Sequence, residues 1–280
     1  MMFDETRCEL GEGPLWHPGR QSLFWFDILN RRMYERPLDG ETRRRDFDDL
    51  TSAAGIIDDN RLLVASEKAL SVLDLTSGTL ETVTALEADN PVTRSNDGRA
   101  DPQGGFWIGT MGKQAQPKAG SIWRFHRGEL RRLFPQITIT NSICFSPDGQ
   151  TAYFADTAEA VIQSVALDGD GWPASAPQVF ADLRSEGLNP DGAVVDAEGC
   201  LWSAQWGASR VARYAPDGRF LEAIEFPVGQ ISCPAFGGAD LATLFATSAH
   251  EGLAQPGDQD GCVFATPTRF RGQAEHRVIL

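Results

Sequence analysis

Short apolar and aromatic runs of four to six residues recur along the whole chain, and turns rich in Asp, Pro, Asn and Gly separate them. Helical periodicity, in which apolar residues recur every three to four positions, is hard to find in this sequence. Short apolar runs bounded by turn residues are typical of strands. The pattern therefore predicts an all-β protein.

These runs belong to a repeat. Six of them align as equivalent strands, at residues 23–27, 61–66, 105–110, 152–157, 201–204 and 244–248. Matching positions in successive runs, from Phe24 to Leu244, lie 38, 44, 46, 49 and 43 residues apart. A second strand follows in five of the units, at 33–37, 70–73, 121–125, 161–165 and 210–214. A period of about 40 to 50 residues built from short strands indicates the four-stranded blade of a β-propeller.

The repeat predicts one domain, a six-bladed β-propeller formed by residues 1–280. A closed ring protects strand edges from aggregation, so we expect a strand near residues 3–9 to pair with the carboxy-terminal blade. A parallel β-solenoid and a two-domain β-sandwich are the structural alternatives.

The net charge of the chain excludes two classes of binding partner. The chain has 39 acidic and 25 basic residues, a net charge of −14, which repels phosphate backbones and anionic lipid. We therefore expect no nucleic-acid or membrane partner.

The start of the chain is charged from Asp4 onward and lacks an apolar leader, which predicts a cytoplasmic protein. The five cysteines have no metal or redox spacing and are interpreted as reduced, buried residues. Because a propeller closes on itself, a monomer is expected.

Candidate chemistry lies in four polar segments, at residues 10–16, 94–98, 139–143 and 188–196. Each segment taken alone is ordinary turn chemistry. Glu12, Asn141 and Asp191, however, each stand shortly before an inner strand of a different blade, so all three can point into one mouth of the central channel. Two carboxylates and an amide oxygen suit a hard divalent cation such as calcium, magnesium or manganese. Three protein ligands leave positions for water or substrate, as metal-assisted catalysis requires.

Five segments also carry a resemblance to a known family, and they stand in the family's order: LGEGPLW, RSNDGRADPQGGFWIGTMG, ITNSICFSPDGQTAYFADT, NPDGAVVDAEGCLWSAQWG and ISCPAFGGADLATLFATSA. Together they resemble the senescence marker protein 30/gluconolactonase family, which includes regucalcin and bacterial sugar lactonases. The resemblance runs from about residue 8 to about 252. It implies a six-bladed propeller with one divalent metal in the channel, and hydrolysis of aldonolactones such as glucono-, arabinono- or xylonolactone.

The same resemblance implies roles for single residues. Glu12, Asn141 and Asp191 would be the metal ligands, with Asp191 also the candidate general base. Arg94, Asn96 and Gln114 would contact the substrate, and Asn96 would also lie near the metal. Two positions depart from the family pattern: Gln114 stands about where a Glu is frequent, and Ser142 stands where a Gly is frequent. The implied cation is one of calcium, zinc, manganese, magnesium or ferrous iron.

The leading hypothesis is therefore metal-dependent hydrolysis of a small sugar lactone to the aldonic acid. An esterase or organophosphate hydrolase of related fold is a second enzyme hypothesis, which a more apolar pocket would favour. A non-catalytic calcium-binding or interaction propeller is the alternative from a different class.

Overall fold

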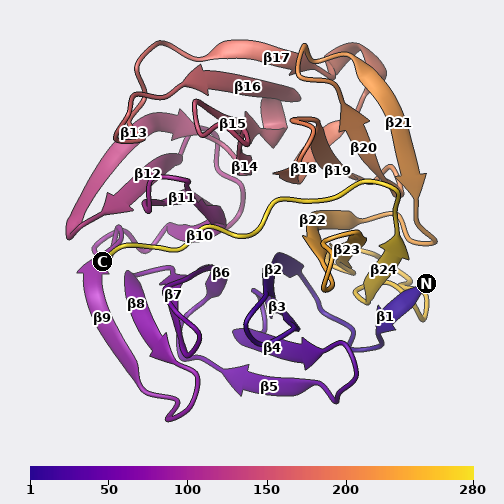
Figure 1. The fold of residues 1–280 in the computed structure, drawn as a ribbon, viewed down its shortest axis with the longest axis horizontal. Helices are drawn as coiled ribbons and strands as arrows, with labels where there is room; N and C mark the ends of the chain where they lie inside the picture. The colour runs from indigo at the N-terminus through magenta and orange to yellow at the C-terminus, as the bar shows by residue number, and fades with distance from the viewer.

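The computed structural model describes residues 1–280 as six four-stranded antiparallel sheets arranged around a central axis, a six-bladed β-propeller (Figure 1). The repeat found in the sequence is therefore confirmed as the blade. The predicted strands at 23–27 and 33–37 correspond to the second and third strands of blade 1, and the same holds around the ring. The structure contains no helix with the length and apolar character needed to cross a membrane.

The blades follow one another along the chain, each from the innermost strand outward. Blade 1 contains β2 (Gly11–His17), β3 (Ser22–Asp27), β4 (Arg32–Pro37) and β5 (Arg43–Asp46), and blade 2 contains β6 (Thr51–Ile56), β7 (Arg61–Ser66), β8 (Ala69–Asp74) and β9 (Leu80–Ala85). Blade 3 contains β10 (Thr93–Ala100), β11 (Phe106–Gly112), β12 (Gly120–His126) and β13 (Glu129–Ile137), and blade 4 contains β14 (Thr140–Phe145), β15 (Thr151–Asp156), β16 (Val161–Ala166) and β17 (Gln178–Asp182). Blade 5 contains β18 (Asn189–Val195), β19 (Leu201–Trp206), β20 (Arg210–Tyr214) and β21 (Phe220–Glu225), and blade 6 contains β22 (Ile231–Gly237), β23 (Thr243–Ser248), β24 (Val263–Pro267) and β1 (Met2–Asp4). Two short 3₁₀ helices, η1 (Thr157–Glu159) and η2 (Arg184–Glu186), lie in the connections.

Blade 6 combines both ends of the chain. Strand β1 forms its outer edge by pairing with β24, with Met2 opposite Phe264 and Asp4 opposite Val263. Its inner strands β22 and β23 come from the last part of the chain, so the ring cannot separate between blades 6 and 1 without breaking this sheet.

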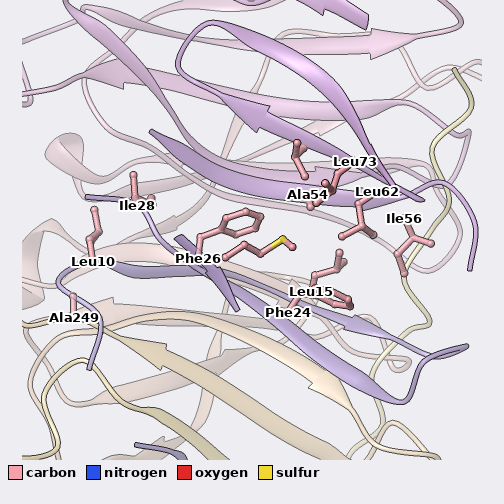
Figure 2. Close-up of a cluster of buried hydrophobic side chains, with 12 residues drawn as sticks. Leu10, Leu15, Phe24, Phe26, Ile28, Ala54, Ile56, Leu62, Leu73 and Ala249 are labelled. Carbon is pink, nitrogen blue, oxygen red and sulfur yellow. The ribbon is translucent and has the colours of Figure 1, made fainter. Parts of the chain in front are cut away.

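The apolar core lies between neighbouring blades. Six buried clusters occur, one at each blade-to-blade interface. At the interface of blades 1 and 2, Leu15, Phe24 and Phe26 pack against Leu62 and Leu73 (Figure 2). Burying such side chains stabilises the fold by roughly 1.5–3 kcal/mol each. All five cysteines are unpaired and buried, as the sequence predicts.

The carboxy-terminal segment crosses the centre of the ring (Figure 1, yellow). Gln273 Nε2 donates to the carbonyl oxygens of Phe145 and Val195, each at 3.0 Å, and Val278 N donates to the Ile56 carbonyl at 2.7 Å. These acceptors are the last residues of β14, β18 and β6. The segment therefore covers the mouth of the channel at which the innermost strands end, and leaves the mouth at which they begin.

Candidate active site in the channel mouth

A cavity of about 270 Å³ occupies the channel mouth where the innermost strands begin. All six residues singled out in the sequence contribute to its wall: Glu12, Arg94, Asn96, Gln114, Asn141 and Asp191. Five of them, all except Gln114, are at most 6% exposed. Residues from β2, β10, β14 and β18, which lie in four different blades, thus meet in one cavity.

The structure corrects the expected local setting of these side chains. They do not stand in loops ahead of an inner strand; Glu12, Asn96, Asn141 and Asp191 lie on the innermost strands β2, β10, β14 and β18 themselves. Each of these strands carries a β-bulge at this point, for example between Glu12 and Leu15 and between Asn141 and Cys144. A bulge inserts one residue and re-aims the side chains around it. Here it coincides with the polar residues that line the cavity.

Gly13 shows why the GEG sequence occurs on β2. Its φ is +55°, a conformation that residues with a side chain rarely adopt, and a Cβ there would lie 2.3 Å from the Ser52 carbonyl oxygen of blade 2. The backbone N–H of Gly13 donates to Glu12 Oε2 at 3.0 Å. Glycine thus allows the close approach of two blades and helps hold the Glu12 carboxylate.

The amides form a continuous network beside the carboxylates. Asn96 Nδ2 donates to Asn141 Oδ1 at 3.1 Å and to the Thr140 carbonyl at 2.8 Å. Asn141 Nδ2 donates to Thr157 Oγ1 at 2.8 Å, and that hydroxyl donates to the Pro190 carbonyl at 2.7 Å. The Asn141 amide oxygen is thereby oriented from two sides.

Arg94 is the buried cation of this cavity. Its Nη1 donates to Asn96 Oδ1 at 2.6 Å and to the Ser95 carbonyl at 2.9 Å. Burial lowers the pKa of its guanidinium, and the nearby carboxylates of Glu251, Glu12 and Asp191 act in the opposite direction. An arginine remains charged under such conditions, so Arg94 presents fixed N–H donors to the cavity.

The carboxylates are buried close together. Burial raises the pKa of Glu12 to about 8, and the Asp97 carboxylate contributes to the same rise. Burial and the Glu12 carboxylate raise the pKa of Asp191 well above its ordinary value. Burial also raises the pKa of Asp97 to about 6, although its Oδ2 accepts a hydrogen bond from Ile143 N at 2.7 Å. Buried carboxylates without a compensating partner are costly, and they favour either a proton or a cation.

Several cavity residues gave no signal in the sequence. Thr157, Glu251 and Trp206 line the wall, as do Met111 and Lys113 beside Gln114. Lys113 forms an ion pair with Glu67, so its charge is already compensated. Trp206 lies two residues beyond the predicted strand at 201–204 and is the last residue of β19 in the structure.

A second acidic cluster, Asp196, Glu198 and Cys200, lies elsewhere in blade 5. Asp196 Oδ1 accepts hydrogen bonds from the backbone of Glu198 and Cys200, and its Oδ2 accepts from Trp202 Nε1 and Arg213 Nε. Its oxygens are therefore used to fix a turn and a buried ion pair, and we do not interpret this cluster as a metal centre.

Fold and site together define a six-bladed propeller with a polar, carboxylate-containing cavity at one channel mouth. The model of the SMP-30/gluconolactonase/LRE-like region matches residues 10–250, and the chain belongs to this family. An L-arabinolactonase of Azospirillum brasilense is 36% identical over 99% of this chain and 94% of its own length. A 6-deoxy-6-sulfogluconolactonase of Pseudomonas putida is 35% identical over 95% of this chain and 94% of its own length. The crystal structure of a calcium-binding protein, regucalcin, from Agrobacterium tumefaciens superposes with a TM-score of 0.98 at 40% identity, covering 100% of this chain and 97% of that chain.

Proposed function

We propose that this protein hydrolyses a small sugar lactone to the aldonic acid with the help of one divalent cation. The observation that carries the proposal is the convergence of two buried carboxylates, two amides and one guanidinium in a single cavity. The cavity volume of about 270 Å³ suits a single monosaccharide-sized ring. The names of the relatives, an L-arabinolactonase and a sulfogluconolactonase, support the same reaction class.

The donor set fits a divalent cation. Glu12, Asn141 and Asp191 are the proposed ligands, because all three line one cavity and its two carboxylates are buried. Without a cation, burial raises the pKa of both carboxylates, and the Glu12 carboxylate adds to the rise at Asp191. An all-oxygen set with two carboxylates suits calcium, magnesium or manganese, and zinc or ferrous iron can occupy it as well. A bound cation supplies Lewis-acid polarisation of the lactone carbonyl.

The substrate is proposed to bind between polar and apolar walls. Arg94 offers its remaining N–H groups to ring hydroxyls, and Gln114 offers an amide at the rim. The Asn96 amide N–H groups are engaged within the protein, so Asn96 would contact a ring hydroxyl through its Oδ1, which also accepts from Arg94. A site that hydrogen-bonds hydroxyls discriminates against substrates that lack them. The wall has nine polar or charged residues and five apolar ones, which favours a sugar over the apolar ester of the second enzyme hypothesis.

Asp191 is proposed to take the proton of the water that attacks the lactone carbonyl. As the ring C–O bond breaks, the same group returns a proton to the leaving oxygen, so the product is the open-chain hydroxy acid. The position of Asp191 supports this role, because its buried carboxylate lines the cavity in which the lactone and the attacking water would meet.

A calcium-binding role without catalysis is the second candidate, because the similar Agrobacterium protein is described as calcium-binding. The space beyond the donors favours catalysis, since a purely structural cation site is closed by protein ligands. The closed ring also needs no partner copy, which supports a monomer.

A pH-stat assay of a substrate panel tests the proposal. Gluconolactone, arabinonolactone and xylonolactone are compared with phenyl acetate and paraoxon, each with added manganese and corrected for spontaneous hydrolysis. We expect turnover of at least one lactone, a much lower kcat/KM for the two other esters, and loss of turnover in Asp191→Asn. Preferential hydrolysis of phenyl acetate or paraoxon, or no turnover of any substrate by folded protein, contradicts it.

A further inference from the structure

All six innermost strands share one irregularity. Each has one extra residue relative to its neighbour at the same point of the blade, as the register shifts of β2, β6, β10, β14, β18 and β22 show. The first bulged residues, in blade order, are Gly13, Ser52, Asn96, Ser142, Asp191 and Ser232. Serine therefore occupies this position in blades 2, 4 and 6.

The three bulge serines make the same kind of contact. Ser52 Oγ donates to the Asn96 carbonyl at 2.6 Å, and Ser142 Oγ donates to the Asp191 carbonyl at 2.6 Å. Ser232 Oγ donates to the carbonyl of Gly11, the residue before Glu12. Each bond crosses from one blade to the next, and all three serines are fully buried.

The acceptors are not arbitrary backbone groups. They belong to blades 3, 5 and 1, and they are the peptide units at Asn96, at Asp191 and directly before Glu12. Asn141, on blade 4, is instead held by Thr157 of the same blade. The serine hydroxyls thus hold the backbone beside two of the three proposed ligands, Glu12 and Asp191, and the backbone of Asn96, whose amide donates to the third ligand, Asn141.

Ser142 has a backbone conformation that favours glycine. Its φ is +57°, in the left-handed region where glycine is favoured and other residues are strained. A glycine would relieve the strain, but it would remove the donor to the Asp191 carbonyl. In this chain Ser142 therefore supplies a donor to the Asp191 carbonyl that a glycine at this position would lack.

We propose that Ser52, Ser142 and Ser232 are positioning residues for the cation site. Each fixes, from the adjacent blade, one backbone carbonyl in the wall of that site. The inference rests on the proposed cation site. Metal ligands must be held close to their productive geometry by supporting contacts, and removing such a supporting hydrogen bond typically weakens metal affinity about 10- to 100-fold. We expect the lower end of this range, about 10-fold, for each single hydroxyl.

The test measures manganese binding to chelator-treated protein by isothermal titration calorimetry, with the unfolding temperature recorded in parallel. The variants are Ser52→Ala, Ser232→Ala and Ser142→Gly. The matched control is Ser22→Ala. Ser22 is also a buried serine, and its hydroxyl donates to the Arg20 carbonyl at 3.0 Å. It lies at the start of β3, opposite His17 and outside the cavity wall. We expect manganese affinity to fall about 10-fold in the three variants and less than 2-fold in the control.

Ser142→Gly decides the question if an alanine variant does not fold, because glycine accepts the backbone conformation at this position. Affinities within 2-fold of the parent in all folded variants, while the parent binds one manganese ion, overturn the positioning role and leave the cation site standing. Absence of manganese binding by the parent protein overturns both.

Discussion

Glu12 is proposed to bind the cation through a buried carboxylate, and without the cation this buried carboxylate destabilises the fold. In the protein without a cation, burial raises the pKa of Glu12 from 4.5 to about 8. The folded chain therefore holds a proton that the unfolded chain releases as the pH rises through 4.5. By linkage, the free energy of unfolding falls between pH 4.5 and about 8, and the difference between the two pKa values corresponds to a loss on the order of 5 kcal/mol.

Glu12→Gln removes this loss, because glutamine keeps the shape and the acceptor for Gly13 N but has no charge to bury. In chelator at pH 8.5 we expect the variant to unfold at a temperature at least about 5 °C above the parent, since about 1 kcal/mol shifts a chain of this size by 2–4 °C. At pH 4.5 the two proteins should unfold alike. Added manganese should raise the unfolding temperature of the parent and not that of Glu12→Gln, because a ligand stabilises only the state that binds it.

Thermal unfolding followed by circular dichroism gives the unfolding temperature of both proteins at pH 4.5 and pH 8.5, with chelator or with manganese. Glu41→Gln is the control, since Glu41 is exposed and lies outside the cavity. A Glu12→Gln variant that is less stable than the parent in chelator at pH 8.5, or that manganese stabilises as much as the parent, refutes the reasoning.

Three further outcomes follow from the structure. Arg94→Ala should raise KM for the lactone at least about 10-fold with a smaller change in kcat, because one lost charged hydrogen bond is worth roughly 1.5–3 kcal/mol; steady-state kinetics would show it, and an unchanged KM would exclude substrate contact. Asp101→Ala should lower the free energy of unfolding by about 3–5 kcal/mol in urea, because it strands the fully buried Arg124, its partner at 2.6 Å. Gln114→Ala should change the ranking of lactones by kcat/KM while manganese affinity stays the same; an unchanged ranking would remove Gln114 from the substrate site.

The sequence predicted the blades because their middle strands carry strong apolar patterns. Strands such as β3 and β11 are fully buried between blades, and their aromatic and aliphatic runs are visible without any structure. The innermost strands were missed for the opposite reason. They line the crowded channel, so β2 reads GEGPLWH and β6 reads TSAAGI, with small and polar residues in place of an apolar run.

The candidate site was predictable only in part. Glu12, Asn141 and Asp191 stood out as polar residues that a strand-and-turn scaffold does not need, and the structure places them around one cavity. The bulges that aim them were not predictable, because the bulged positions carry glycine, serine, asparagine or aspartate, the same residue types that fill the turns between strands. Thr157 and Glu251 escaped notice because their contacts depend on distant blades meeting at the axis.

The central claim, that one cation held by Glu12, Asn141 and Asp191 is required for lactone hydrolysis, is tested most directly by titrating manganese into chelator-treated protein. Bound manganese, measured by calorimetry, and turnover of the best lactone, measured in the pH-stat, are followed in the same preparation. We predict negligible turnover without cation, a rise in activity that parallels occupancy, and saturation at one manganese ion per chain. Full turnover in chelator, or activity that saturates while this site is empty, would contradict the account.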